Sequence, residues 1–323
     1  MTGVQTCALP IYHYSRGEGQ RQRFVSRERA YHGVNMAGVS LSGMIKNRQA
    51  FGPGIPGVIH MRHTWSPENG FVRGQPDTGI ELADDLERAA MNYGPDTIAA
   101  CIVEPIAGST GCLVPPKGYL ERLREICDVH GILLIFDEVI CGFGRLGAPF
   151  GAQAFGVIPD VMTMAKALTN AAQPMGAVAV SDKVHSTILE AAPEGAVEFF
   201  HGYTYSAHPA ACAAGLATMD LFEKEDLVAR AEALSPYFLD QVFALSDLEI
   251  ITDIRGYGLF AGIDISPEGG AGVRGFDFQK RLYRNGLHIK MTGDAGLLAP
   301  PLIAEPKHID RMCEILRQTL LEY

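Results

Sequence analysis

The sequence lacks the long apolar run that a membrane-spanning helix needs. Proline, asparagine, glutamine or a charged residue interrupts every apolar stretch before it reaches spanning length. Extended basic runs are also absent, because the densest clusters are Arg21-Gln-Arg23 and Ser26-Arg-Glu-Arg29, and the net charge is -10. These absences argue against a membrane or a nucleic acid as partner, so we expect a small-molecule ligand.

Paired cysteines are missing as well. The seven cysteines are scattered, with no CxxC pair and no His/Cys cluster. An odd number of scattered cysteines is typical of a reducing compartment and of neither a disulfide framework nor a zinc site. We therefore expect a cytoplasmic protein that binds no metal.

With 323 residues and 47% hydrophobic composition, the chain can bury a large core, and its length suggests about two domains. Residues 1–11, MTGVQTCALPI, lack the basic start and the apolar length of a signal peptide. They resemble translated sequencing-adapter read-through. The fold prediction therefore begins at Tyr12.

Downstream of that segment, short apolar runs alternate with helical patterns. Residues 98–103 and 132–136 are continuous apolar runs typical of buried strands, and residues 116–131 between them have a helical apolar stripe. This succession predicts an α/β fold with a mostly parallel, doubly wound sheet. Ligands bind beyond the carboxyl ends of such strands, where Glu104 and Asp137 fall.

The C-terminal part has another pattern. After His208-Pro209, the sequence predicts two successive helices, of which the first is rich in alanine. Residues 249–323 then read strand, strand, helix, strand, helix. We place a boundary near residue 223, which divides a large domain, residues 12–222, from a small α+β domain, residues 223–323.

Lys166 is the only charged residue between Asp160 and Asp182. An ammonium in so apolar a setting costs free energy unless it is paired, titrated or used chemically. Asp137 ends another apolar run upstream. A lone amine and a lone acid, each at the end of an apolar segment, suggest a Schiff-base lysine and the partner of a pyridinium nitrogen, which is the pairing that pyridoxal phosphate (PLP) requires.

Each residue also has a structural alternative. A lysine beside a strand often lays its stem over apolar surface and keeps its ammonium in water. An Asp-Glu pair after a strand often caps the next turn. The run Gly142-Phe-Gly144-Arg-Leu-Gly147 satisfies GxGxxG, but Pro149 and Gly151 follow it and no amphipathic helix begins there. We interpret these glycines as a loop that shapes the backbone, not as an NAD site.

Several ordered motifs resemble class III PLP-dependent aminotransferases. They are FDEVICGFGRLG at 136–147, DVMTMAKALTN at 160–170, GAVAVSD at 176–182 and HGYTYSAHPAACAAGLA at 201–217, with RAYHGV and VEPIAGSTG upstream. Within the class, GYTYSAHP and the C-terminal GD…APPLI resemble the ω-amino acid:pyruvate and β-alanine–pyruvate transaminases. The resemblance implies PLP fold type I, the architecture of aspartate aminotransferase.

The resemblance also implies residue roles. Lys166 would bind PLP as a Schiff base and move a proton between substrate and cofactor, and Asp137 would keep the pyridine nitrogen protonated. Val139 would pack under the ring and Tyr31 over it, although a valine beside a strand is otherwise plain core. Glu104 would lie near the cofactor edge; its alternative is a strand-end carboxylate paired with an arginine.

Three further expectations follow from the family. Thr204 would reach the phosphate of a partner subunit, so the active unit would be a homodimer. Lys290 stands where related enzymes often place an arginine that binds the substrate carboxylate, and a lysine lacks the planar fork of a guanidinium; alternatively, it is an exposed lysine in a turn. The Gly-Ser-rich loop that normally holds the phosphate has no counterpart in residues 1–11, so we expect a fragment truncated at its N-terminus.

The expected activity is the ping-pong transfer of an amino group from an ω-amino acid or amine, such as β-alanine, to a keto acid such as pyruvate. Another class III activity, an aminomutase or a decarboxylase, needs the same Lys166 and Asp137. A catalytically incompetent fragment is the alternative outside the enzyme class.

Overall fold

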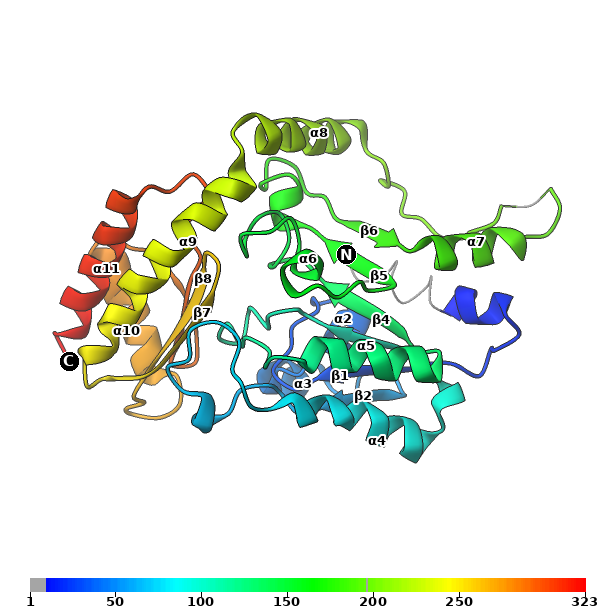
Figure 1. Cartoon of the computed structure of the whole chain (residues 1–323), viewed down its shortest axis with the longest axis horizontal. Coiled ribbons are helices and arrows are strands. Elements are labelled where there is room, and N and C mark those ends of the chain that lie inside the picture. The colour runs from blue at the N-terminus through cyan, green and yellow to red at the C-terminus, as the bar shows by residue number, and fades with distance from the viewer. Residues whose placement is uncertain (1–9, 196) are drawn as a thin grey trace.

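Two separate β-sheets organise the chain (Figure 1). The computed structural model describes residues 10–195 and 197–323. The first sheet has six strands in the order β2-β1-β3-β4-β5-β6, and the second has four in the order β7-β8-β10-β9. Residues 1–9 lie outside the described part, so most of the segment excluded on sequence grounds has no structural account. Ile11, its last residue, packs against the core cluster that contains Tyr12.

The first sheet is parallel except at one edge. Its strands are β1 (Arg23–Arg27), β2 (Val58–Met61), β3 (Ile98–Val103), β4 (Leu133–Asp137), β5 (Val161–Met164) and β6 (Ala177–Val180). Only β6 runs antiparallel, against β5. The mostly parallel sheet that the sequence predicts is therefore confirmed, and β3 occupies the predicted residues.

Helices cover both faces of this sheet, which is why its central strands are continuous apolar runs. They are α2 (Met36–Leu41), α3 (Ile45–Phe51), α4 (Asp84–Tyr93), α5 (Tyr119–His130), α6 (Gly151–Phe155) and α7 (Asp182–Glu190), and residues 10–15 are also helical. Helices α4 and α5 lie side by side over one face (Figure 1) and share a core cluster with β3 and β4. Helix α7 and Tyr12 pack with the opposite face.

Glycine ends the predicted helix between β3 and β4. Helix α5 stops at His130, and Gly131 adopts the left-handed conformation with φ 64° while its N–H caps the carbonyl of Cys127. The GxGxxG run also behaves as predicted: residues 138–150 form a loop rich in turns, and the helix that follows it, α6, has only five residues.

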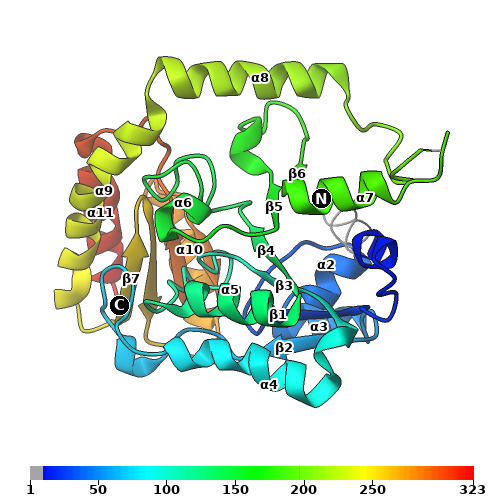
Figure 2. The ribbon, with the colours of Figure 1, turned by 45° about the vertical axis from the view of Figure 1, so that its right-hand side comes forward.

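The second sheet is antiparallel and belongs to the C-terminal part. Helix α8 (Pro209–Lys224) leads from the side of the first sheet to α9 (Leu227–Phe243) (Figure 2). Then follow β7 (Ile251–Tyr257), β8 (Phe260–Ile265), α10 (Val273–Arg284), β9 (Lys290–Thr292), β10 (Ala295–Leu298) and α11 (Pro306–Leu320). The single strand predicted between the last two helices is wrong: it is a hairpin, because Gly293 and Asp294 turn the chain within one apolar stretch.

Short 3-10 turns complete the fold: η1 (Pro67–Asn69), η2 (Ile80–Ala83), η3 (Pro95–Thr97), η4 (Lys166–Leu168) and η5 (Ala244–Asp247). Six cysteines lie in the described part; all are free, and all but Cys212 are buried. No helix within that part is both long and apolar enough to cross a membrane.

A buried arginine joins the two sheets. Arg255 on β7 pairs with Asp253 and, through both terminal nitrogens, with Asp264 of β8. Its Nε donates to the carbonyl of Gly111, in the loop after β3, at 2.6 Å. The contact fixes the C-terminal sheet against the loop beside Glu104. We propose the boundary near residue 223 as the limit between the domains 12–222 and 223–323, close to where α8 ends.

Candidate active site

Three ionisable residues follow adjacent parallel strands at one edge of the first sheet. Glu104 comes directly after β3, Asp137 ends β4 and Lys166 lies two residues beyond β5. Strands β4 and β5 pair in register, with Asp137 opposite Thr163. Because parallel strands end at the same edge, their final side chains converge there.

These residues line one cavity of about 380 Å³. Its walls are Tyr31, His32, Gly33, Val34, Asn35, Glu104, Asp137, Val139, Ile140, Thr163 and Lys166. Five of the seven residues that the sequence singles out therefore come together. The volume lies in the range of ordinary small-molecule sites.

Asp137 is a buried carboxylate with 6% of its surface exposed. His32 Nδ1 donates to its Oδ2 at 2.8 Å, and the backbone N–H of Val139 donates to its Oδ1 at 3.2 Å. Each carboxylate oxygen keeps a lone pair for a further donor. The group is thus oriented by the protein and still able to bind a ligand N–H.

Sequence reasoning missed His32. The residue lies 105 positions from Asp137, and its ring is buried, with no partner for Nε2 among the described residues. A signal existed, because His32 follows Tyr31 directly in the motif RAYHGV. The motif alone, however, does not predict that the ring of His32 bonds the carboxylate of Asp137.

Glu104 is also buried, and backbone amides hold it. Tyr31 N donates to Oε1 at 3.0 Å and Gly108 N to Oε2 at 2.8 Å. Burial raises the pKa of this carboxyl, and His32 and both amides oppose the rise. The alternative of a carboxylate paired with an arginine is wrong, because Arg27 bonds the backbone carbonyl of Glu104 and not its side chain.

Lys166 begins the turn η4 in the left-handed backbone region, with φ 47°. Residues other than glycine adopt this conformation rarely, and functional sites are where such strain concentrates. The side chain as a whole is exposed, because it faces the open space of the cavity. Desolvation of the amine lowers its pKa. The negative charges of Asp137 and Glu104 raise the pKa, and the positive charge of Lys290 lowers it further.

A second cavity, of about 860 Å³, extends from Lys166 toward the C-terminal sheet. Lys290 on β9 lines it, and its Nζ donates to the carbonyl of Ser109 at 3.4 Å. Burial lowers the pKa of Lys290, and Glu104 opposes the change. Most other walls are apolar, with Phe143 and Phe222 among them. The structure therefore places a second lysine in a cavity that shares Lys166 with the first.

Thr204 does not join either cavity. It is exposed, in the segment between α7 and α8, beside the exposed rings of Tyr203 and Tyr205. Its predicted contact with a partner subunit stays a prediction.

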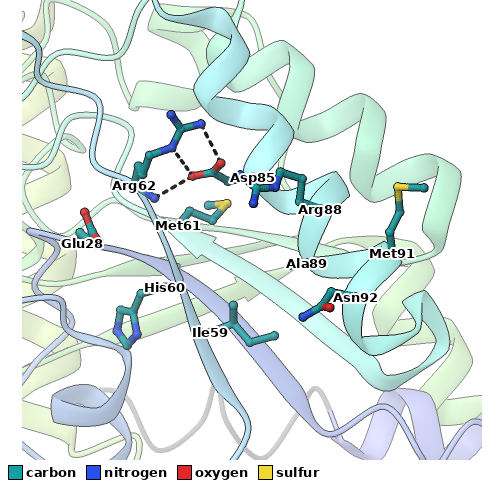
Figure 3. Close-up of a pocket in the computed structure, with 10 residues that line it drawn as sticks. All are labelled: Glu28, Ile59, His60, Met61, Arg62, Asp85, Arg88, Ala89, Met91 and Asn92. Atoms are coloured by element: carbon teal, nitrogen blue, oxygen red, sulfur yellow. Dashed lines mark hydrogen bonds and ion pairs between the residues drawn. The ribbon is translucent and has the colours of Figure 1, made fainter.

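Another hollow lies away from Lys166, between β2 and α4 (Figure 3). It measures about 610 Å³, and Arg62 on its wall bonds Asp85 through two side-chain nitrogens at 2.9 and 2.8 Å. No residue that lines this hollow also lines the Lys166 cavity, so its geometry indicates no shared chemistry.

The charges around Lys166 predict opposite effects of two substitutions. Asp137→Asn removes a negative charge and should lower the pKa of Lys166, whereas Lys290→Ala removes a positive charge and should raise it. The rate of acylation of Lys166 against pH, measured by mass spectrometry on the peptide 161–170, reports this pKa. Lys117, exposed and paired with Asp77, is the internal control. Shifts in the same direction would contradict this electrostatic picture.

Comparisons with known proteins show the family. The family model for class III aminotransferases matches residues 6–320. The chain is 53% identical to an omega-aminotransferase of Caulobacter vibrioides over 96% of its own length and 71% of the relative's. It is 46% identical to a beta-alanine–pyruvate aminotransferase of Pseudomonas aeruginosa, over 96% of its length and 69% of that protein.

A solved structure gives the same result for the fold. The omega transaminase of Pseudomonas jessenii in complex with PMP superposes with a TM-score of 0.91 at 32% identity, and the match covers 98% of this chain and 71% of that one. The chain belongs to the class III aminotransferases.

Proposed function

We propose that this protein is a PLP-dependent ω-transaminase that moves the amino group of an ω-amino acid or amine, such as β-alanine, to a keto acid such as pyruvate. The observation that supports this best is the meeting of the Lys166 amine and the buried Asp137 carboxylate in one cavity. The names of the relatives favour transamination over the aminomutase and decarboxylase alternatives.

The residues of the cavity suit two functional groups of PLP, the aldehyde and the pyridine nitrogen. The amine of Lys166 suits its aldehyde, and the free lone pairs of Asp137 suit a protonated pyridine nitrogen. The phosphate has no comparable partner, because Lys166 is the only basic side chain other than His32 among the residues that line the cavity. Thr204 of a partner subunit would supply one donor to it in a homodimer.

PLP, when bound, supplies an electron sink for the carbon that carries the substrate's amino group. The protein supplies the proton transfers and the electrostatics. Lys166 would take the proton from that carbon and hold it for return, a task that a lowered pKa favours because the amine must be neutral to act as a base. Asp137, held by His32, would face the ring nitrogen and favour its charged form.

The remaining residues shape the space around the ring. Val139 and Tyr31 come from different segments and line the same cavity, so they can hold a flat ring between them. Glu104 anchors Tyr31 through its backbone amide. We propose that Lys290 binds the carboxylate of the amino acid or keto acid. It lines the adjoining cavity together with Lys166, and its charge is close enough to lower the pKa of Lys166.

The function is tested by mixing the chain with PLP, β-alanine and ¹³C-labelled pyruvate and measuring ¹³C-labelled alanine by mass spectrometry, because unlabelled alanine has the same mass as β-alanine. Lys166→Ala should lower the rate by about 10²- to 10⁴-fold, the usual worth of a positioned proton donor and acceptor. The release of carbon dioxide in place of alanine would support the decarboxylase alternative. Absence of any turnover in the unaltered chain would favour the incompetent fragment.

Lys290 allows a test of substrate class. Lys290→Ala should raise KM for β-alanine and pyruvate by about 10-fold or more, since a hydrogen bond to a charged group contributes about 1.5–3 kcal/mol. A simple amine without a carboxylate should show no such change as donor in the first half-reaction, which needs no keto acid. Lys290→Arg keeps the charge and should restore KM. Equal losses for both donors would indicate an exposed lysine without this role.

A further inference from the structure

One loop connects the Lys166 cavity with the C-terminal sheet. Residues 138–150 run from the end of β4 to the start of α6. Val139 and Ile140 line the Lys166 cavity, and Phe143 and Arg145 line the second cavity. Arg145 Nη1 donates to the carbonyls of Leu259 and Pro300 at 3.0 and 2.6 Å. The position of this loop therefore determines a wall of both cavities.

A single side chain closes the loop. The carboxylate of Glu138, at its start, accepts the N–H of Gly151 and the N–H of Ala152, each at 2.8 Å, at its far end. The backbone of Glu138 is fixed too, because its N–H donates to Thr163 at 2.9 Å and its carbonyl accepts from Gly142 at 2.9 Å. Glu138 has no exposed surface.

The backbone that donates to this carboxylate is tightly packed, so a side chain at position 151 would not fit. A Cβ on Gly151 would lie 2.8 Å from Pro105 and 3.1 Å from Glu138 Oε2, so only glycine fits there. No described arginine, lysine or histidine forms an ion pair with Glu138; the two amides are its partners. Asp137 beside it and Cys141 in the loop are the titratable groups that face it, and the buried thiol of Cys141 has a pKa well above its ordinary value.

We propose that Glu138 is a positioning residue that holds the loop 138–150 closed and thereby sets the place of Val139 and Asp137 in the active site. The link is short: Val139 N donates to Asp137 Oδ1 at 3.2 Å, so movement of the loop breaks a contact that orients the catalytic carboxylate. The role in turnover rests on the proposed function, whereas closure of the loop does not.

Closure should depend on pH with a defined sign. Burial raises the pKa of Glu138 from 4.5 to about 7; the amides of Gly151 and Ala152 oppose the rise, and Asp137 adds to it. The closed loop thus binds a proton more tightly than the open loop, where water solvates the carboxylate. Closure is strongest below pH 4.5, weakens as the pH rises to about 7 and is constant above it.

Hydrogen exchange of the full chain without cofactor tests closure directly. After correction for the intrinsic exchange rate, the protection of residues 138–155 should fall by up to about 300-fold between pH 4.5 and pH 8. Glu138→Gln should remove this pH dependence, and Glu138→Ala should lower protection at every pH. If the alanine variant fails to fold, the glutamine variant alone decides.

Asp294 gives a matched control, because it accepts the N–H groups of Gly272 and Gly275 at 2.8 and 2.9 Å at the start of α10. Asp294→Asn should loosen residues 272–275 and leave the pH dependence of residues 138–155 as in the unaltered chain. The proposal is overturned if the hydrogen-exchange protection of residues 138–155 depends on pH in Glu138→Gln as it does in the unaltered chain.

The role in the active site is tested by kcat/KM for β-alanine and pyruvate against pH. The unaltered chain should show a transition near pH 7 that Glu138→Gln lacks. Identical profiles would overturn the positioning role. An unaltered chain that shows the expected exchange but no turnover would refute the proposed function while supporting closure of the loop by Glu138.

Discussion

One amine and one carboxylate meet at neighbouring strand ends, and the proposed chemistry of the site requires both. Asp137 and Thr163 are paired across β4 and β5, and Lys166 follows three residues later along the chain. The parallel pairing therefore brings Lys166 into the cavity that Asp137 also lines. Although the side chain as a whole is exposed, desolvation of its ammonium makes Lys166 easier to deprotonate, and the carboxylate of Asp137 limits that effect. The balance suits a group that must alternate between proton donor and proton acceptor.

Around this pair, the protein fixes the acid more firmly than the base. Asp137 is held by His32 and by the backbone of Val139, and Val139 belongs to the loop that Glu138 closes. Lys166 faces open space from a left-handed turn. An acid held by two hydrogen bonds and an amine that faces open space agree with their proposed tasks, since a ring nitrogen needs a fixed partner while a proton carrier must reach two atoms.

Much of this arrangement was predictable because buried parallel strands are continuous apolar runs, so the sequence alone places Glu104 and Asp137 at strand ends. The family motifs then indicated Lys166, Tyr31 and Val139. Contacts between distant segments were not predictable: nothing in the sequence joins His32 to Asp137, or the carboxylate of Glu138 to the amides of α6. The composition around Lys166 does not show that its side chain faces open space either, because that depends on the turn η4.

The most direct measurement is the site of covalent attachment of PLP. The chain is incubated with PLP, reduced with borohydride, digested and mapped by mass spectrometry. The geometry around Asp137 predicts the adduct on Lys166, in the peptide 161–170, and its loss in Lys166→Arg. An adduct on Lys290 or on an exposed lysine, with Lys166 unmodified, would contradict the assignment of this cavity as the active site.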